Sequence, residues 1–373
     1  MVATQEKTPL LSHKPHDGQR FVLVIHGGAG TMSRATSTPE RQALYKSALK
    51  TALEAGYAVL REGGEAMDAA VAAVTVLEDC PLFNAGKGAV FNTSGKNELE
   101  SSIMLSKTPA FHPDVPPTRR GFALTLLTRT RNPSHLARAL YLSPEIVPHA
   151  MLSGHEAESV GEGLGIERVD PSYFFTEQRW KEHRRGLGLP DEPYPPGQSP
   201  SKDEPWESLD QMPTGTVGAV ALDCRSCIAS VTSTGGKTNK MVGRIGDTPQ
   251  MGSGFWAEEW KEKRLVKKLL NKFRGRRQTR AIGVSGTGDG DYFIRLATCC
   301  TIARRVKYTG ESIETASKAC VEELRRDGGL GGVIVLDESG NYAMPLNCEG
   351  MYRGVIEEDG NAKVAIFHDE VLA

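Results

Sequence analysis

Hydrophobic and polar residues alternate along the chain in blocks whose lengths predict an α/β protein. The apolar run 21–25 predicts a strand, and a glycine-rich turn is predicted to follow it at 26–30. Residues 39–61 are predicted to form a helix, because Thr38 is a good N-cap residue and proline is favoured at the first helical position. Residues 65–78 are apolar on all sides, which predicts a helix buried between two layers.

Further along the chain the alternation of strands and helices continues. Strands are predicted at 217–223 and 228–233, with a tight turn between them, and a basic helix is predicted at 257–274. The other predicted elements are helices at 133–142, 155–162, 292–307 and 311–326, a strand at 281–285, and a hairpin with strands near 332–337 and 341–346.

Two segments lack such a pattern. Residues 1–20 are polar and charged, and they predict a disordered arm. Residues 174–213 crowd prolines, glycines and charges together, which predicts a mobile linker just before Thr216. The length of 373 residues allows one large or two ordinary domains.

Charge and composition narrow the classes of function. A net charge of −1, with 24% charged residues, gives no electrostatic basis for a nucleic-acid or membrane-surface partner, and leaves small polar substrates open. No stretch approaches the roughly 18 apolar residues of a membrane span. Residues 1–20 lack the features of a secretory signal, and the seven scattered cysteines suit reduced thiols, so we expect a cytoplasmic protein.

Residues 224–227 form a lone CxxC motif. A redox role or half of a zinc site is one interpretation, but the chain offers no second pair of ligands at zinc-site spacing. Because the motif falls between two predicted strands, a hairpin turn is the favoured interpretation.

Candidate chemistry centres on Gly215 and Thr216. Cleavage of the bond between them would give Thr216 a free α-amine, so that one residue carries both a hydroxyl nucleophile and a base. The unperturbed pKa of such an amine, about 7.7–8.0, lies close to working pH. Gly215 has no Cβ and can adopt the strained backbone that brings the hydroxyl onto the preceding carbonyl. On local pattern alone, residues 217–222 favour a simpler interpretation, the start of a buried strand.

Further motifs support the catalytic interpretation. They are Ser233-Thr234-Gly235-Gly236, residues 239–247, Thr287-Gly288, residues 26–30, Phe83-Asn84-Ala85-Gly86 and residues 347–353. In this order, and over roughly residues 20–355, the chain resembles the plant-type (type III) asparaginases, also called isoaspartyl peptidases, which are N-terminal nucleophile hydrolases. The resemblance implies a four-layer αββα sandwich, with two stacked and mostly antiparallel sheets covered by helices, in one structural domain.

The resemblance also implies how the chain is processed. Self-cleavage would separate an α-subunit, residues 21–215, from a β-subunit, residues 216–373, whose first residue Thr216 is the nucleophile. Thr234 would hydrogen-bond to the amine and hydroxyl of Thr216, a role that suits a hydroxyl able both to donate and to accept.

The implied substrate is asparagine or a β-aspartyl dipeptide. Thr287 and Gly288 would form the oxyanion hole through a hydroxyl and a backbone N–H. Arg244 would clamp the substrate α-carboxylate, and Asp247, helped by the carbonyl of Gly290, would bind its α-ammonium. Without the resemblance, the arginine and aspartate would be interpreted as a surface ion pair, and residues 286–291 as a glycine-rich turn that opens a helix.

The resemblance implies no organic cofactor, but it does imply a sodium site. The corresponding loop in the family wraps the ion with backbone carbonyls, here those of Leu77, Glu78, Cys80, Phe83, Ala85 and Lys87. Such a site depends on backbone shape rather than on side chains. Asn84 in this loop would lend its amide to the active site, with a turn asparagine as the alternative. The family also implies a homodimer of αβ units.

Three departures from the family pattern leave substrate choice open. Residues 100–106, Glu-Ser-Ser-Ile-Met-Leu-Ser, stand where family members usually carry Asp-Ala-Ser-Ile-Met-Asp-Gly, residues 110–130 also differ, and Asp289 replaces a small or basic residue. An extra carboxylate near the pocket would change the preferred leaving group, so a glycosylasparaginase-like β-aspartyl amidase is one alternative. The other is an uncut chain that binds ligands without catalysis.

Overall fold

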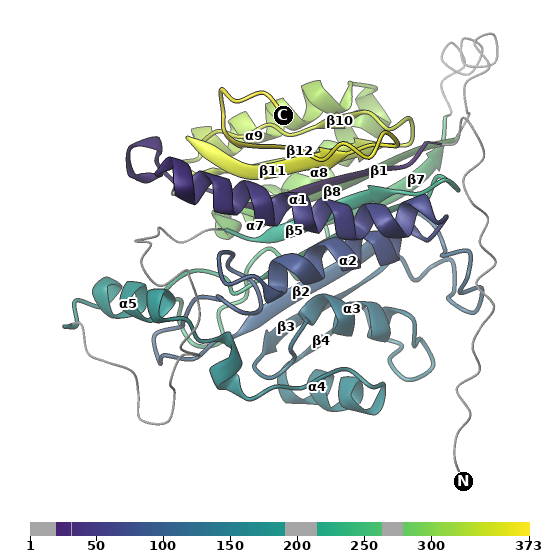
Figure 1. The fold of residues 1–373 in the computed structure, drawn as a ribbon. Helices are drawn as coiled ribbons and strands as arrows, with labels where there is room; N and C mark the ends of the chain where they lie inside the picture. The colour runs from purple at the N-terminus through teal and green to yellow at the C-terminus, as the bar shows by residue number, and fades with distance from the viewer. Residues whose placement is uncertain (1–19, 31, 191–214, 263–278) are drawn as a thin grey trace.

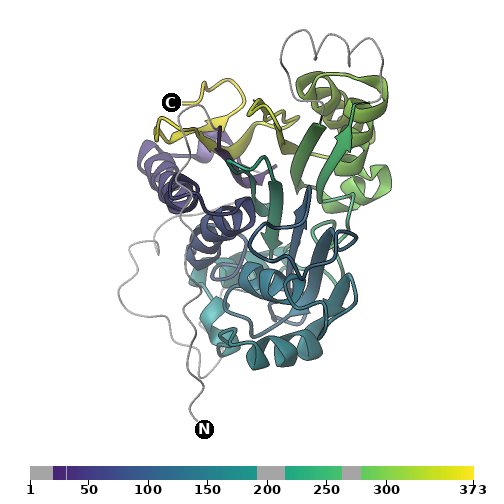
Figure 2. The same ribbon diagram turned by 90° about the vertical axis from the view of Figure 1, so that its right-hand side faces the viewer.

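The computed structural model describes residues 20–30, 32–190, 215–262 and 279–373. Within these residues two β-sheets stack face to face, and helices cover both outer faces (Figure 1). Figure 2 shows the two helical layers on opposite sides, with residues 39–79 at the left and the green helices of residues 290–326 at the upper right. The four-layer αββα sandwich predicted from the sequence is confirmed.

The larger sheet has eight strands in the described part of the chain. Their spatial order is β12 (Lys363–Phe367), β11 (Gly350–Ile356), β1 (Val22–Ala29), β5 (Val217–Leu222), β6 (Ile228–Thr234), β2 (Leu99–Leu105), β3 (Gly121–Leu127) and β4 (Met151–Ser153). Neighbouring strands are antiparallel except for β3 and β4. The smaller sheet is antiparallel, in the order β10 (Tyr342–Ala343), β9 (Gly331–Asp337), β8 (Thr279–Gly288) and β7 (Phe255–Lys261).

Helices form the outer layers. Against the larger sheet pack α1 (Pro39–Arg61), α2 (Ala66–Asp79), α3 (Pro133–Tyr141) and α4 (Gly154–Gly163), and against the smaller sheet pack α8 (Thr298–Arg304) and α9 (Ile313–Arg326). The remaining helical segments are α5 (Glu177–Gly186), α7 (Gly290–Leu296), the 3-10 turns Arg34–Thr36 and Pro171–Phe174, and a π-helical turn, Arg305–Thr309.

Local sequence explains how the first two helices begin and pack. Thr38 caps α1, because its side-chain oxygen accepts the N–H of Arg41 at 3.3 Å, and Pro39 occupies the first turn. Helix α2 lies between α1 and strands β5 and β6, so its alanine and valine side chains are buried on nearly every side. Both predictions are confirmed.

The turn between β5 and β6 is built on Asp223, which is buried. Its Oδ1 accepts the N–H groups of Arg225 and Cys227, both at 2.9 Å, and its Oδ2 accepts the N–H of Ala66 at 3.1 Å. Strands β5 and β6 pair antiparallel up to Leu222 opposite Ile228, so the hairpin turn predicted for the CxxC motif is confirmed, and Cys224 and Cys227 in it are free thiols. One buried carboxylate therefore ties this hairpin to the first turn of α2.

The predicted basic helix at 257–274 is wrong in its first part. Strand β7 occupies this segment and pairs with β8 from Phe255 opposite Ser285 to Lys261 opposite Thr279. Phenylalanine and tryptophan favour strands, and pairing with β8 outweighs the helix propensity of the alanine and glutamates between them. Residues 263–274 lie outside the described residues.

Two further predictions need correction. Residues 26–29 continue β1 with a β-bulge between His26 and Gly28, because β11 pairs with this stretch up to Ala29, so the glycine-rich turn predicted there is wrong. The first part of the predicted linker contains α5, which is capped by Thr176 and anchored by a buried Arg179. The rest of that linker, 191–213, and residues 1–19 of the predicted arm lie outside the described residues.

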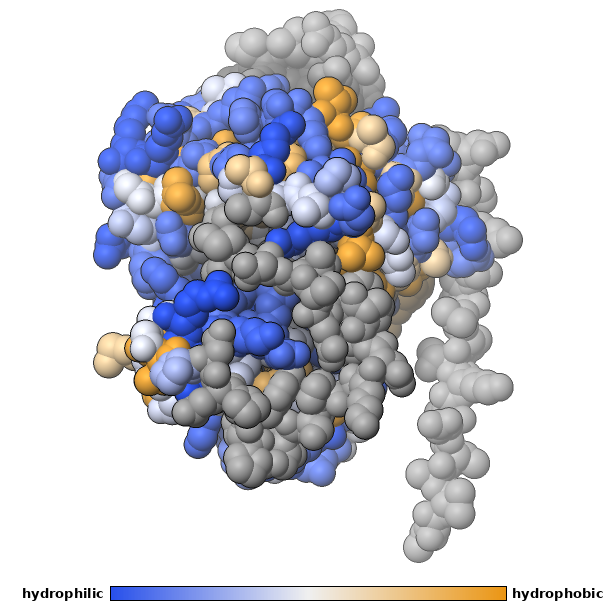
Figure 3. Space-filling model, turned by 60° about the vertical axis from the view of Figure 1, so that its left-hand side comes forward, coloured by the Kyte–Doolittle hydropathy of each residue, from blue (hydrophilic) through white to orange (hydrophobic). Residues whose placement is uncertain are grey.

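The surface and the cysteines bear on cellular context. The described residues on the face shown in Figure 3 are largely hydrophilic, with hydrophobic side chains in small separate groups. The helices of the described segments are each too short or too polar to span a membrane. All seven cysteines are free thiols. The cytoplasmic location stays a prediction from cysteine usage.

Asp223→Ala is expected to lower the free energy of unfolding by about 2–3 kcal/mol, because two buried N–H groups and one part-buried N–H group lose their acceptor. Asp359→Ala is the matched control: Asp359 accepts the N–H of Asn361 at 3.0 Å in an exposed turn, and its loss should change stability by less than about 0.5 kcal/mol. Urea unfolding midpoints compare the two. Equal effects would contradict the role given to Asp223.

Candidate active site

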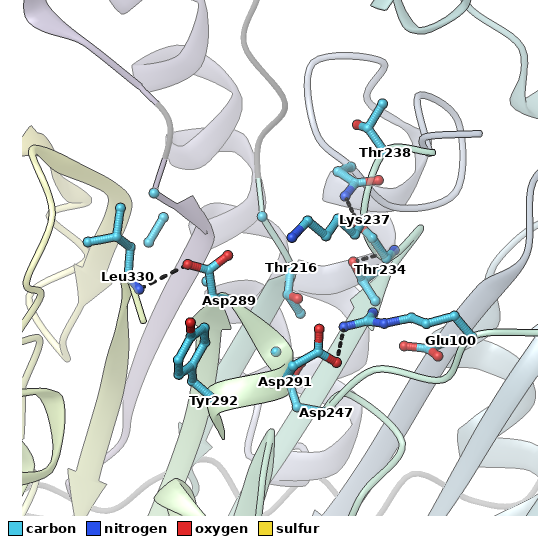
Figure 4. Close-up of a pocket in the computed structure, with 18 residues that line it drawn as sticks. Glu100, Thr216, Thr234, Lys237, Thr238, Asp247, Asp289, Asp291, Tyr292 and Leu330 are labelled. Atoms are coloured by element: carbon cyan, nitrogen blue, oxygen red, sulfur yellow. Dashed lines mark hydrogen bonds and ion pairs between the residues drawn. The ribbon is translucent and has the colours of Figure 1, made fainter. Parts of the chain in front are cut away.

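A cavity of about 230 Å³ lies at the ends of central strands of the larger sheet, beside the start of α7 (Figure 4). It is smaller than the roughly 300–1,000 Å³ of drug-sized pockets, which suits a ligand of amino-acid size. Among the residues predicted from the sequence, its lining includes Asn84, Gly215, Thr216, Thr234, Arg244, Asp247, Gly288 and Gly290. The structure thus gathers these residues from both halves of the chain around one cavity.

Strand pairing sets three lining side chains in a row. Val217 lies opposite Ser233, and extending this register by one residue places Thr216 opposite Thr234. On the other side of β6, Thr234 lies opposite Glu100 of β2. Directly opposed residues share one face of a sheet. The row Glu100, Thr234 and Thr216 therefore faces the cavity from the ends of three adjacent strands.

The Gly215–Thr216 bond is enclosed by close backbone contacts. A Cβ at Gly28, which has φ of +117°, would lie 2.6 Å from the nitrogen of Gly215. A Cβ at Gly215 would lie 2.6 Å from the side-chain oxygen of Thr287. Thr287 lies behind the cavity wall, and its oxygen accepts the N–H of Ala29 at 3.2 Å, which leaves its own O–H able to donate. Neither glycine tolerates a side chain.

His26 holds the carbonyl of Thr216. Its Nδ1 lies 2.9 Å from that oxygen and its Nε2 lies 2.7 Å from Ser285 Oγ. Burial lowers the pKa of His26 to about 3, so the ring is neutral at working pH. A carbonyl only accepts, so Nδ1 donates to Thr216, and Nε2 accepts from the hydroxyl of Ser285. The sequence contained His26 in a family motif but gave no role for it.

Arg244 already binds a carboxylate of the protein. Its Nη2 lies 3.0 Å from Oδ1 of Asp291, whose side chain is half exposed. An ion pair open to solvent on one side contributes little stability, so a ligand carboxylate can replace Asp291 at the guanidinium. The Arg244–Asp247 ion pair considered from sequence is absent among the described contacts.

Asp247 is buried beside Arg244, and its Oδ2 has no hydrogen-bond partner within the described residues. Burial, and secondarily the charge of Glu100, raise the pKa of Asp247 to about 7. A buried carboxylate without a partner is costly, and an ammonium group would stabilise it. Because Asp247 lines the cavity, its carboxylate is suited to bind a cation there.

Asn84 spans the wall of the cavity. Its amide Nδ2 donates to the carbonyl of Gly236 at 2.7 Å, and its Oδ1 accepts the N–H of Val90 at 3.0 Å. Both ends of the amide are therefore engaged with the backbone. The oxygen of Thr234 accepts the N–H of Gly236 at 3.0 Å, which leaves the hydroxyl proton for another acceptor.

The loop of residues 77–87 has the shape of a carbonyl cradle. Lys87 donates its N–H to the carbonyl of Glu78 at 2.7 Å and closes the loop. A Cβ at Gly86 would lie 2.4 Å from the same carbonyl oxygen, and a Cβ at Gly88 would lie 2.8 Å from that of Phe83. Carbonyl oxygens thus crowd where only glycine leaves room. This backbone fits a cation held by main-chain oxygens.

Several lining residues escaped the sequence interpretation, namely Glu100, Lys237, Thr238, Asp291, Tyr292 and Leu330. Glu100 did carry a signal, because it opens the segment that departs from the family pattern. Asp289, another of the three departures, lines the cavity, but its Oδ2 accepts the N–H of Leu330 at 3.0 Å. The rest reach the cavity through loop geometry that spacing in the sequence does not encode.

Two stacked sheets between helical layers, with an internal threonine at the start of a central strand, define the class of N-terminal nucleophile hydrolases. The chain belongs to the asparaginase family, whose model matches residues 19–261 and 277–366.

Relatives of similar length support this assignment. The isoaspartyl peptidase of Escherichia coli is 36% identical over 339 residues, which cover 90% of this chain and 92% of the relative. The isoaspartyl peptidase/L-asparaginase of Xenopus laevis is 32% identical, with 94% and 96% covered. That of Mus musculus is 34% identical, with 86% and 83% covered. The family resemblance inferred from the motifs is confirmed.

His26 should control the geometry of Thr216. His26→Asn keeps an amide donor near the position of Nδ1, whereas His26→Gln directs its amide toward Ser285. Intact-mass measurements would follow the self-cleavage that the sequence predicts at Gly215–Thr216. Its rate should be near normal in the first variant and about 10- to 100-fold slower in the second, because Thr216 is then misplaced. The same rate in both variants would argue against the Thr216 contact.

Proposed function

We propose that this chain cleaves itself between Gly215 and Thr216 and then hydrolyses isoaspartyl dipeptides and L-asparagine. The relatives named above carry those activities in their names. The observation that carries the proposal is that one small cavity holds Thr216 and Thr234 together with Arg244 and Asp247. Two hydroxyls for acyl transfer thus lie beside a cation and a carboxylate that match an amino-acid backbone.

Self-cleavage would begin with attack of Thr216 Oγ on the carbonyl carbon of Gly215. The C–N bond to Thr216 breaks, the nitrogen takes a proton and becomes the free α-amine, and water hydrolyses the resulting ester. The close packing of Gly215 against Gly28 and Thr287 supports this step, since it restrains the bond near the attacking group. His26 fixes the carbonyl of Thr216 on the other side.

Turnover repeats this chemistry on a substrate. The α-amine of Thr216 removes the proton from Oγ, and Oγ attacks the side-chain carbonyl of the substrate. The hydroxyl of Thr287 and the N–H of Gly288 would donate to the oxyanion, a contribution of about 3–4 kcal/mol per donor in comparable enzymes. The leaving nitrogen takes the proton and departs as ammonia or an amino acid. Water, activated by the same amine, then releases aspartate.

Arg244 and Asp247 would orient the substrate. The guanidinium would exchange Asp291 for the α-carboxylate, and Asp247 would bind the α-ammonium with help from the carbonyl of Gly290. The carbonyls of loop 77–87 would hold a sodium ion, which supplies only positive charge to fix the loop that carries Asn84. A homodimer of αβ units remains part of the proposal.

Thr216→Ala should leave the chain uncut and abolish ammonia release, whereas Thr216→Ser, which keeps a hydroxyl, should still cleave. Denaturing intact-mass measurements and N-terminal sequencing follow the cut, and a coupled assay follows ammonia from asparagine. Turnover by an uncut chain would overturn the mechanism. Titration of the uncut variant with aspartate tests the non-catalytic alternative, which predicts binding without any turnover in the wild type.

Affinity for aspartate should fall as the pH is lowered from 7 to 5. The ammonium binds the ionised form of Asp247, whose pKa is about 7, so each pH unit below that value should weaken binding by up to about tenfold. The Asp247→Asn variant should bind aspartate weakly at every pH between 7 and 5, and its affinity should not depend on pH. Calorimetry on the processed protein measures the affinity of the wild type and of the variant at each pH. If the affinity of the variant still falls with pH, the titrating group is not Asp247.

A further inference from the structure

Glu100 is a buried carboxylate in the wall of the cavity, outside the set of residues that the family motifs pointed to. Its side chain is 1% exposed, and it extends from β2 beside Thr234, in the row that contains Thr216. Figure 4 shows its carboxylate pointing into the cavity, on the side of Asp247. A charge placed there without a function would be destabilising.

The two oxygens of Glu100 have different environments. Oε1 accepts the N–H of Gly246 at 2.8 Å and the hydroxyl of Thr125 at 3.4 Å. Oε2 has no hydrogen-bond partner within the described residues. A Cβ at Gly246 would lie 2.9 Å from Oε2 and 2.7 Å from Nη1 of Arg244, so the absence of a side chain keeps a gap open between these two groups.

The cations around Glu100 oppose by their charge the rise in its pKa that burial causes, but within the described residues they make no hydrogen bond to its Oε2. Nζ of Lys240 donates to the carbonyls of Glu98 at 2.6 Å and of Gly235 at 3.1 Å. Arg244 pairs with Asp291 at 3.0 Å. Asp247, the other buried carboxylate, also has an oxygen without a partner within the described residues. Two unpartnered carboxylate oxygens in one small cavity are complementary to a ligand that brings its own positive charge.

We propose that Glu100 is a positioning residue for substrate: its Oε2 and the carboxylate of Asp247 together receive the α-ammonium, so the site selects amino acids over their deaminated analogues. This inference rests on the proposed function for the identity of the ligand. The bond from the N–H of Gly246 to Oε1 holds the Glu100 side chain in place, and Oε2 supplies the charge that faces the ammonium. The glutamate at this position reaches further than the aspartate of the family motif by one methylene.

The test compares two isosteric variants of the processed protein. Glu100→Gln keeps an oxygen for the N–H of Gly246 and replaces the charged Oε2 by an amide NH₂. Glu98→Gln is the matched control, because Glu98 anchors the same loop through the N–H of Gly243 at 3.1 Å but does not line the cavity. Calorimetry at pH 8 measures affinity for L-aspartate and for succinate, which lacks the ammonium.

In Glu100→Gln, affinity for aspartate should fall about tenfold or more while affinity for succinate is unchanged or increases. In Glu98→Gln the ratio of the two affinities should equal that of the wild type. Glu100→Asp keeps a carboxylate, so its aspartate-to-succinate affinity ratio should lie between those of the wild type and Glu100→Gln. This variant replaces Glu100→Gln in the test if the glutamine variant does not fold. With substrate, Glu100→Gln should raise KM with little change in kcat.

An unchanged aspartate-to-succinate ratio in Glu100→Gln would overturn the proposal, and so would a wild-type protein that does not prefer aspartate. These outcomes are separate from failure of the proposed function. A protein that never releases ammonia, yet loses its preference for aspartate in Glu100→Gln, would refute the hydrolase mechanism and support the ammonium receptor.

Discussion

Antiparallel pairing of β5 with its neighbours is the constraint on which the site depends. The pairing with β6 sets Thr216 opposite Thr234, and the pairing with β1 brings His26 beside β5, opposite Gly218. A slip of one residue would turn Thr216 toward the other face of the sheet. The packing of α2 and of the smaller sheet on both faces of β5 holds that register. The position of Thr216 is therefore fixed by the core rather than by the loops.

Burial gives the charged and titratable groups of this site their properties. The ring of His26 stays neutral because burial lowers its pKa, although the hydrogen bond to the carbonyl of Thr216 acts in the opposite direction. The same exclusion of water raises the pKa values of Asp247 and Glu100. A low-dielectric cavity strengthens every interaction with a zwitterion and penalises ligands that leave a charge unpaired. In the proposed function, selectivity for a zwitterion and affinity for it would both come from this exclusion of water.

Sequence patterns predicted the elements whose signals are local. The cap at Thr38, the all-round apolar surface of α2 and the turn at 224–227 each follow from neighbouring residues. Strand β7 and the extension of β1 did not, because long-range pairing decided them. At the site, the motifs brought eight lining residues and Thr287 to attention. Glu100 escaped because its role depends on a cross-strand neighbour 134 positions away.

The close packing around Gly215 has a consequence for how each chain would be processed. Gly28 and Thr287 pack against Gly215 inside the same polypeptide that carries Thr216, so the proposed self-cleavage would be a first-order event in each molecule. Its yield would then be independent of protein concentration. Under the same proposal, a chain with a defective Thr216 would stay uncut even when it is coexpressed with a normal one.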